Sequence, residues 1–287
     1  MNRKIVWFLV SFLTVAALLL ISCAPAEVEE EEEVIPEEEE EEVAVEEEEV
    51  APAPEEPQYG GWINFPFTTD IPGFDEIDTG HYSVYSLWLT NEELLRGDWA
   101  KGPAGTNEAD FILGGINLLS LKAGCLAESW EIPEKGTMIF HIRRGVHYAL
   151  NPDSEASRLV NGRELTADDV VFSLKRVCEG SLSYIHSSYP ALAASAEITA
   201  PDEWTVVTRC PLEEFGNMIT LFPDFATIMP PEVIEKYGDM TDWRNSCGTG
   251  PFILVDYVSG SSATLIRNDN YWDKDPVGAG KGNQLPY

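Results

Sequence analysis

Basic residues are scarce in this sequence of 287 residues, which has 18 lysines and arginines against 50 aspartates and glutamates. The formal net charge is −32 at pH 7. A chain with this balance repels the phosphates of nucleic acids and the headgroups of anionic lipids. The lack of positive charge therefore excludes nucleic-acid binding as the function.

The common signatures of metal sites and catalytic sites are also missing. Histidine occurs four times, at positions 81, 141, 147 and 186, and no two of these have the i, i+4 spacing of a helical zinc site. There is no Gly-x-Ser-x-Gly turn for a hydrolase nucleophile. The run Gly278–Gly282 lacks the hydroxyl residue that follows the lysine of a phosphate-binding loop. We therefore expect no cofactor, no metal site and no enzymatic activity.

The first residues have the pattern of an export signal. Met1–Lys4 is basic and Ile5–Ile21 is almost entirely apolar. An uncleaved transmembrane anchor is the alternative, because an apolar run of about 17–20 residues can span a bilayer. The residues Leu20–Cys23, which read LISC, resemble the lipobox of bacterial lipoproteins. This resemblance implies a signal peptide over residues 1–22, lipidation of Cys23, and an extracytoplasmic protein anchored to the cell membrane, in the periplasm or on its outer face.

Residues 23–57 are predicted to form a disordered acidic tether after the lipidated cysteine. Residues 27–56 contain 18 glutamates and no basic residue. Like charges repel each other, and the few valines, alanines and prolines cannot build a core, so the segment should stay extended. Metal sequestration by the glutamates is the alternative, but carboxylates on a flexible chain are not preorganised. A solvated spacer is the simpler interpretation.

Residues 58–287 have the composition of a folded body. Period-two alternation predicts strands over 137–143 and 204–210, and Gly-flanked apolar runs predict strands over 59–65, 252–257 and 263–267. Thr166 as N-cap, with acids in the following turn, predicts a helix over 166–178. A second helix is expected from Pro230 to Gly238 and a short helix beginning over 91–95, whereas 96–110 should be loop. Without a regular βαβ rhythm, the fold class is α/β in the mixed α+β sense.

Five segments of this body resemble the family 5 extracellular solute-binding proteins, which serve peptide, dipeptide and nickel importers. The segments occur in the order that the family has. They read LAESWE at 126–131, FHIRRGV at 140–146, NGRELTADDVVFSL at 161–174, GTGPF at 248–252 and RNDNYW at 267–272. The sequence departs from the family at 147–160, where it has a longer polar stretch.

The resemblance implies a periplasmic-binding-protein-like fold of the large two-lobed class. It implies the substrate-binding component of an ABC importer, which captures oligopeptides or similar solutes and delivers them to membrane permease subunits. In the family a second lobe follows the last motif, and a late segment returns to the first lobe. We therefore expect residues 58–287 to hold only the first-lobe region, without the second lobe and without the C-terminal return segment. A surface adhesin or structural lipoprotein, and an extracellular hydrolase, remain as alternatives.

Ligand contacts are expected from loops at the ends of first-lobe strands. The predicted ligand-binding residues are Phe67, Thr68, Thr69, Tyr189 and Thr249. Four cysteines follow Cys23, and an exported protein permits disulfides. Among the three complete pairings we favour one that contains Cys210–Cys247, because these two flank a compact strand–helix stretch.

Overall fold

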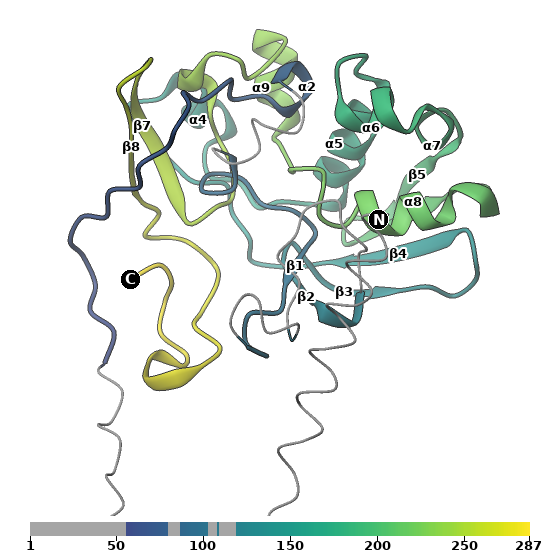
Figure 1. Ribbon diagram of the computed structural model, residues 1–287, viewed down its shortest axis with the longest axis horizontal. Helices are drawn as coiled ribbons and strands as arrows, with labels where there is room; N and C mark the ends of the chain where they lie inside the picture. The colour runs from purple at the N-terminus through teal and green to yellow at the C-terminus, as the bar shows by residue number, and fades with distance from the viewer. Residues whose placement is uncertain (1–55, 80–86, 103–107, 109–118) are drawn as a thin grey trace, which may run out of the picture. The chain divides into compact units, whose positions relative to one another are not determined.

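The computed structural model describes residues 56–79, 87–102, 108 and 119–287, and within these the chain forms helices and three antiparallel sheets (Figure 1). Strand β1 (Leu95–Gly97) pairs with β2 (Lys122–Gly124), and β7 (Phe252–Val258) pairs with β8 (Ser262–Arg267). The third sheet has four strands in the order β3-β4-β6-β5. The predicted mixed α+β class is confirmed, as is the antiparallel pair at the C-terminal side.

The four-stranded sheet provides one wall of the hydrophobic core. Its strands are β3 (Ala127–Glu131), β4 (Thr137–Ile142), β5 (Glu197–Asp202) and β6 (Thr205–Arg209). Met138, Phe140 and Ile142 alternate along β4 and are at most 1% exposed. Burying each such side chain stabilises the fold by about 1.5–3 kcal/mol. The period-two prediction for this strand and for β6 is confirmed.

Helix α5 (Ala167–Glu179) packs on the buried face of that sheet, against β5 and β6. Its start is fixed by a capping box, in which the Asp169 carboxylate accepts a hydrogen bond from the Thr166 amide at 2.8 Å. Val170 and Leu174 on its inner face are fully buried. Gly180 follows the last turn. The helix and its N-cap were both predictable because cap, first-turn acids and apolar periodicity agree.

In the described residues six further α-helices accompany α5 (Figure 1). The helix that begins with two prolines was predicted, and it is α9. The polar stretch 147–160, where the sequence departs from the family, contains α4, which begins after the N-cap Ser154. The six are α2 (Glu76–Thr79), α4 (Glu155–Val160), α6 (Tyr184–Ser188), α7 (Pro190–Ser195), α8 (Phe215–Leu221) and α9 (Pro231–Tyr237).

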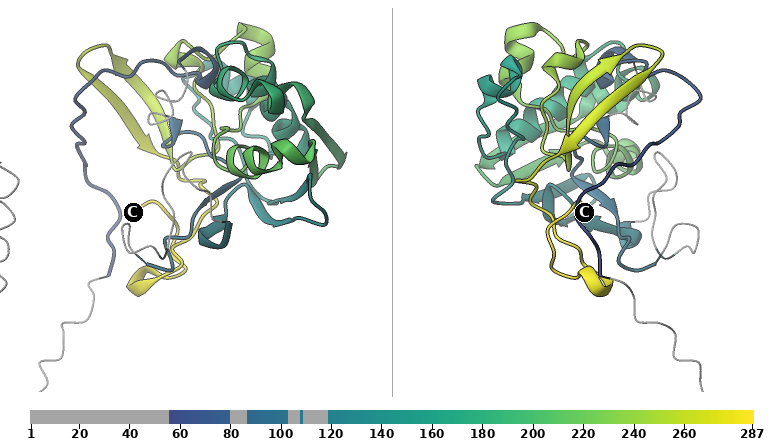
Figure 2. Two further views of the ribbon diagram at one scale, coloured as in Figure 1. Left: turned by 45° about the vertical axis from the view of Figure 1, so that its right-hand side comes forward. Right: turned by 90° about the vertical axis from the view of Figure 1, so that its left-hand side faces the viewer.

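The predicted first strand over 59–65 is not formed. No strand within the described part of the chain pairs with this segment, so its backbone has no ladder to join. Instead it is held at its two ends. The Tyr59 hydroxyl donates to the Gln284 carbonyl at 2.8 Å, and the Asp70 carboxylate accepts from Tyr257 and Ser259 of the β7–β8 hairpin at 2.9 and 2.7 Å. Figure 2 shows the segment running beside that hairpin.

The region from 91 to 110 also differs from prediction. The expected helix is absent, and β1 begins at Leu95 because its backbone pairs with β2, a partner distant in sequence. Residues 98–102 form a turn, in agreement with the predicted loop, while 103–107 and 109–110 lie outside the described residues. The short-range signal for a helix was outweighed by a long-range strand pairing.

Candidate functional site

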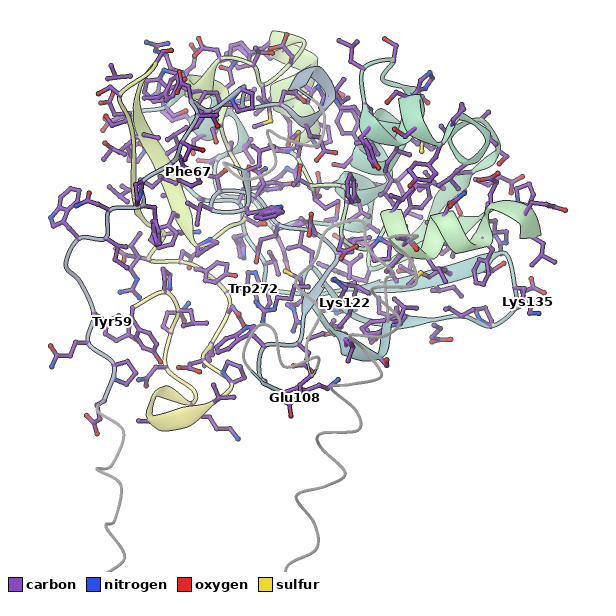
Figure 3. The ribbon with its side chains drawn as sticks, in the orientation of Figure 1. Tyr59, Phe67, Glu108, Lys122, Lys135 and Trp272 are labelled. Carbon is purple, nitrogen blue, oxygen red and sulfur yellow. The ribbon has the colours of Figure 1, made fainter. Side chains whose placement is uncertain are left out.

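The structure does not bring the predicted ligand-binding residues together. Phe67, Thr68 and Thr69 are exposed on the N-terminal segment, where Phe67 is 72% exposed (Figure 3). Tyr189 is half-buried between α6 and α7, with its ring 5.9 Å from that of Tyr184. Thr249 has no exposed surface. Phe67 and Tyr189 therefore remain accessible, and the burial of Thr249 favours a packing role in this arrangement.

The loop that contains Thr249 is glycine-rich because it lies directly against another backbone. A Cβ atom on Gly248 would lie 2.1 Å from the Thr90 carbonyl oxygen, and one on Gly250 would lie 2.7 Å from the Thr90 carbonyl carbon. The Gly250 amide donates to that same carbonyl oxygen at 3.0 Å. Only glycine permits this approach. The glycines of the GTGPF motif therefore allow this loop to pack directly against the backbone at Thr90, and we call this contact the backbone joint.

A buried carboxylate, Glu92, lies at the centre of this joint, and the sequence analysis did not identify it. Its oxygens accept hydrogen bonds from the Tyr271 hydroxyl at 2.7 Å, the Trp272 indole at 2.9 Å and the Cys125 thiol at 3.4 Å. The Thr249 hydroxyl faces it from the glycine-rich loop. The pair Tyr271-Trp272 in the RNDNYW motif was the available signal, since buried indole and phenol groups need an acceptor.

Two arginines enclose the Trp272 ring. The Arg143 guanidinium lies 4.4 Å from the ring centroid and that of Arg96 lies 5.6 Å from it. Arg143 also donates to the Cys125 carbonyl, and Arg96 pairs with Asp273 at 2.6 Å. Such cation–π contacts are worth about 0.5–2 kcal/mol each. Trp272, which is labelled in Figure 3, therefore fixes the end of the 267–272 motif to the segments that carry Arg96 and Arg143.

The residues around Glu92 have the properties of a packing contact and not those of a catalytic site. Burial raises the pKa of Glu92, although the hydrogen bonds from Trp272 and Tyr271 oppose that rise. Burial also raises the pKa of the Cys125 thiol well above its ordinary value, and the Glu92 carboxylate adds to the effect. A thiol held protonated in this way is a poor nucleophile. The arrangement anchors chain segments to one another and has no activated group to offer a substrate.

The predicted Cys210–Cys247 disulfide is not present, because both residues are free thiols, as are Cys125 and Cys178. Cys210 directly follows β6, and its amide donates to the Gly136 carbonyl. Cys247 is buried, and its thiol points to the Ala149 carbonyl at 3.9 Å. The two cysteines therefore contact different parts of the fold. The prediction used only the fact that both flank the same strand–helix stretch in the sequence, and this does not determine where their side chains lie. Within the described ranges no group of three or more potential ligands could hold a metal ion.

A comparison with protein families matches residues 123–284 to the model described as "Bacterial extracellular solute-binding proteins, family 5 Middle". The dipeptide-binding protein of Escherichia coli K12 is 34% identical over 167 residues, which cover 53% of this chain and 30% of that protein. Heme-binding protein A of Haemophilus influenzae is 31% identical over 164 residues, covering 51% and 28%.

Solved structures show the same fold. The structure of Haemophilus influenzae OppA in complex with the peptide RPPGFSPFR has a TM-score of 0.51 and 22% identity, covering 71% of this chain and 37% of that one. Across these comparisons the chain spans about a third of the length of the proteins it matches.

Proposed function

This chain belongs to the bacterial extracellular solute-binding proteins of family 5, and we propose that it forms part of the peptide-binding component of an ABC importer. The family consists of extracytoplasmic binding proteins and not of enzymes. The observation that carries the proposal is the match over residues 123–284, which includes all five motifs completely and agrees with the fold. These motifs form a capped helix, a core strand and the backbone joint at Thr90. Each of these elements supports the fold, as expected for the scaffold of a binding protein.

The identity of the ligand is the finer part of the proposal. The relatives differ in what their names say they bind, since one is called dipeptide-binding and another heme-binding. An oligopeptide is favoured here because the OppA structure of the same fold was solved with one. We propose that the ligand contacts include Phe67, Thr68 and Thr69, whose exposure leaves them accessible, and Tyr189. Permease subunits of the importer are the proposed protein partners.

Anchoring at the membrane is proposed for the N-terminal region. Cys23 and the acidic tether up to residue 55 lie outside the described residues. In the part of the chain that the structure does describe, no helix combines the length and the apolar character needed to cross a bilayer. The LISC sequence supports a lipid anchor at Cys23, from which the tether, extended to at most ~100 Å, would let the body move.

Deleting the gene is expected to abolish uptake of the imported peptide by the host cell, because the permease of such an importer receives its substrate from the binding protein. Uptake of an isotopically labelled tripeptide measures this directly, with the reintroduced gene as the control that restores transport. Peptide uptake that is unchanged by the deletion, together with a loss of surface attachment, would contradict the proposal and favour an adhesin.

A further inference from the structure

Four ionisable side chains meet inside the body, remote in sequence from one another. They form what we call the Glu76 cluster, defined as Glu76 on α2, Glu93 just before β1, Lys122 in β2 and Asp224 after α8. Glu76 and Asp224 are 7% and 4% exposed, and the Lys122 side chain is 2% exposed. Three of the four side chains are thus shielded from water, and Glu93 is half-buried with one carboxylate oxygen out of reach of solvent.

The contacts within the cluster hold α2 to the segment that follows α8. One carboxylate oxygen of Glu76 accepts hydrogen bonds from the Thr227 amide at 2.9 Å and the Thr227 hydroxyl at 2.5 Å. Lys122 forms an ion pair with Asp224. The Glu93 carboxylate interacts with the charges of Asp224, Glu76 and Lys122. The Glu76–Thr227 contact bridges 151 positions of sequence, so it is a direct fastening of the N-terminal region to the body.

The neighbouring charges do not neutralise both glutamates. Asp75 lies beside Glu76, and its carboxylate forms a bidentate ion pair with Arg176. The Cys125 thiol lies near Glu93 and also near Glu92 and the Arg96 guanidinium. Three cations that the structure describes therefore lie in this region, and each has a carboxylate partner: Arg176 with Asp75, Lys122 with Asp224 and Arg96 with Asp273. Glu76 and Glu93 are surplus carboxyls.

A buried carboxyl without a cation keeps its proton more readily than one in water. Burial raises the pKa of Glu76 to about 7, against the opposing effect of the Thr227 hydrogen bonds, and the Asp75 charge adds to the rise. Burial raises the pKa of Glu93 well above its ordinary value, and the charges of Asp224 and Glu76 reinforce it. Glu76 is therefore expected to change charge near neutral pH, and Glu93 to keep its proton more readily than a glutamate in water.

We propose that Glu76 and Glu93 form a proton-operated latch, which fastens α2 and the N-terminal segment to the body when protonated and loosens them when ionised. A protonated Glu76 still accepts the hydrogen bonds from the Thr227 amide and hydroxyl, and it does so without placing an unpaired negative charge in the core. Ionisation of Glu76 adds negative charge beside Asp75 and Glu93, which repel it, while the Arg176 guanidinium opposes that repulsion only in part because it is paired with Asp75. The latch thus responds to pH through the two carboxyls whose neighbouring cations are paired with other carboxylates.

The sign of the effect follows from linkage. Because the folded state raises the pKa of Glu76, it binds a proton that the unfolded chain releases. The stabilisation is complete below the ordinary pKa of glutamate and is lost as pH rises through about 7. For Glu76 alone the unfolding equilibrium constant should rise roughly thirtyfold between about pH 5.5 and about pH 8.5.

The test is urea unfolding of the chain at the two pH values, followed by tryptophan fluorescence. Glu76→Gln mimics the protonated acid, so it should remove most of this pH response and be more stable than the parent protein at the higher pH. Glu128→Gln, at an exposed glutamate of β3, is the matched control and should respond as the parent does. A Glu76→Gln variant that keeps the full pH response would overturn the latch.

Amide exchange in the unaltered protein tests the same latch without any substitution. The Thr227 amide, which donates to Glu76, should lose protection between about pH 5.5 and about pH 8.5 beyond the intrinsic acceleration of exchange. Amides in β4, which lie in the core sheet, serve as the reference. Constant protection at Thr227 relative to β4 would contradict the latch, whether or not the glutamine variant folds.

Discussion

Replacing Asp75 with alanine is expected to lower the free energy of unfolding by about 3–5 kcal/mol, because it leaves a largely buried guanidinium without its partner. Asp75 is 0% exposed, and the Arg176 side chain is 13% exposed. Two parallel hydrogen bonds of 2.8 and 2.6 Å join them, and the Met240 amide donates to the same carboxylate at 2.8 Å. The substitution therefore also removes an anchor between the N-terminal segment, α5 and the residues after α9.

Urea unfolding of the parent and of Asp75→Ala measures this loss. Lys236–Glu155 is the matched control pair, since its side chains are 40% and 68% exposed, and Glu155→Ala should leave stability nearly unchanged. Replacing Asp75 and Arg176 together with Leu and Met should cost less than the sum of the two single replacements. An Asp75→Ala protein as stable as the parent would show that this pair contributes nothing to the fold.

The same pair has a pH dependence opposite to that of Glu76. Burial alone would raise the pKa of Asp75, but the hydrogen bonds and charge of Arg176 outweigh it, so the pKa lies below its ordinary value. The stabilisation is present above the ordinary pKa of aspartate and is lost as pH falls through the lowered pKa of the folded state. A fall to strongly acidic pH and a rise above about pH 7 should thus each weaken the fastening of the N-terminal segment, the first through Asp75 and the second through Glu76.

Cys23→Ala is expected to release the protein from the membrane completely. Two or three acyl chains on Cys23, at about 0.8 kcal/mol for each buried methylene, would hold the chain stably, and nothing else in the proposal attaches it. Fractionation after carbonate washing measures the release, and mass spectrometry of the parent should show an acylated N-terminal cysteine. Cys210→Ala, at a partly exposed cysteine of the body, is the matched control and should stay with the membrane.

Retention of the Cys23→Ala protein in washed membranes would contradict lipid anchoring. It would favour the alternative in which the apolar run Ile5–Ile21 stays uncleaved as a transmembrane anchor. The mature N-terminus distinguishes the two, because a lipoprotein begins at Cys23 and an anchored protein keeps the residues before it.

Elements whose signals are local could be predicted from the sequence. Helix α5 has its cap, first-turn acids and apolar face within one continuous stretch, and β4 has a clear alternation. The β7–β8 hairpin is likewise formed by neighbours in sequence. The two strand predictions that failed both depend on pairing with residues that are distant in the sequence. The segment 59–65 has the residues of a strand but no strand partner in the described chain, and β1 takes its shape from β2.

The site was less predictable than the fold for the same reason. Adjacent Glu92 and Glu93 resemble a helix start in sequence, yet both lie inside the body, where Glu92 meets Trp272 across 180 positions. The predicted disulfide failed because sequence separation does not report the direction of a side chain. Motif resemblance, in contrast, correctly identified the family, since its five segments record long-range packing that no single segment explains.

Calorimetric titration with peptides tests the central claim most directly. We expect residues 58–287 alone to show no micromolar binding, because a cleft binder gains affinity by enclosing its ligand between two surfaces. Joined to the second lobe that completes the family's cleft, the same residues should bind a peptide with one-to-one stoichiometry. Tight, stoichiometric binding by residues 58–287 alone would contradict the proposed cleft, and a two-lobed protein that binds no peptide would contradict the proposed ligand.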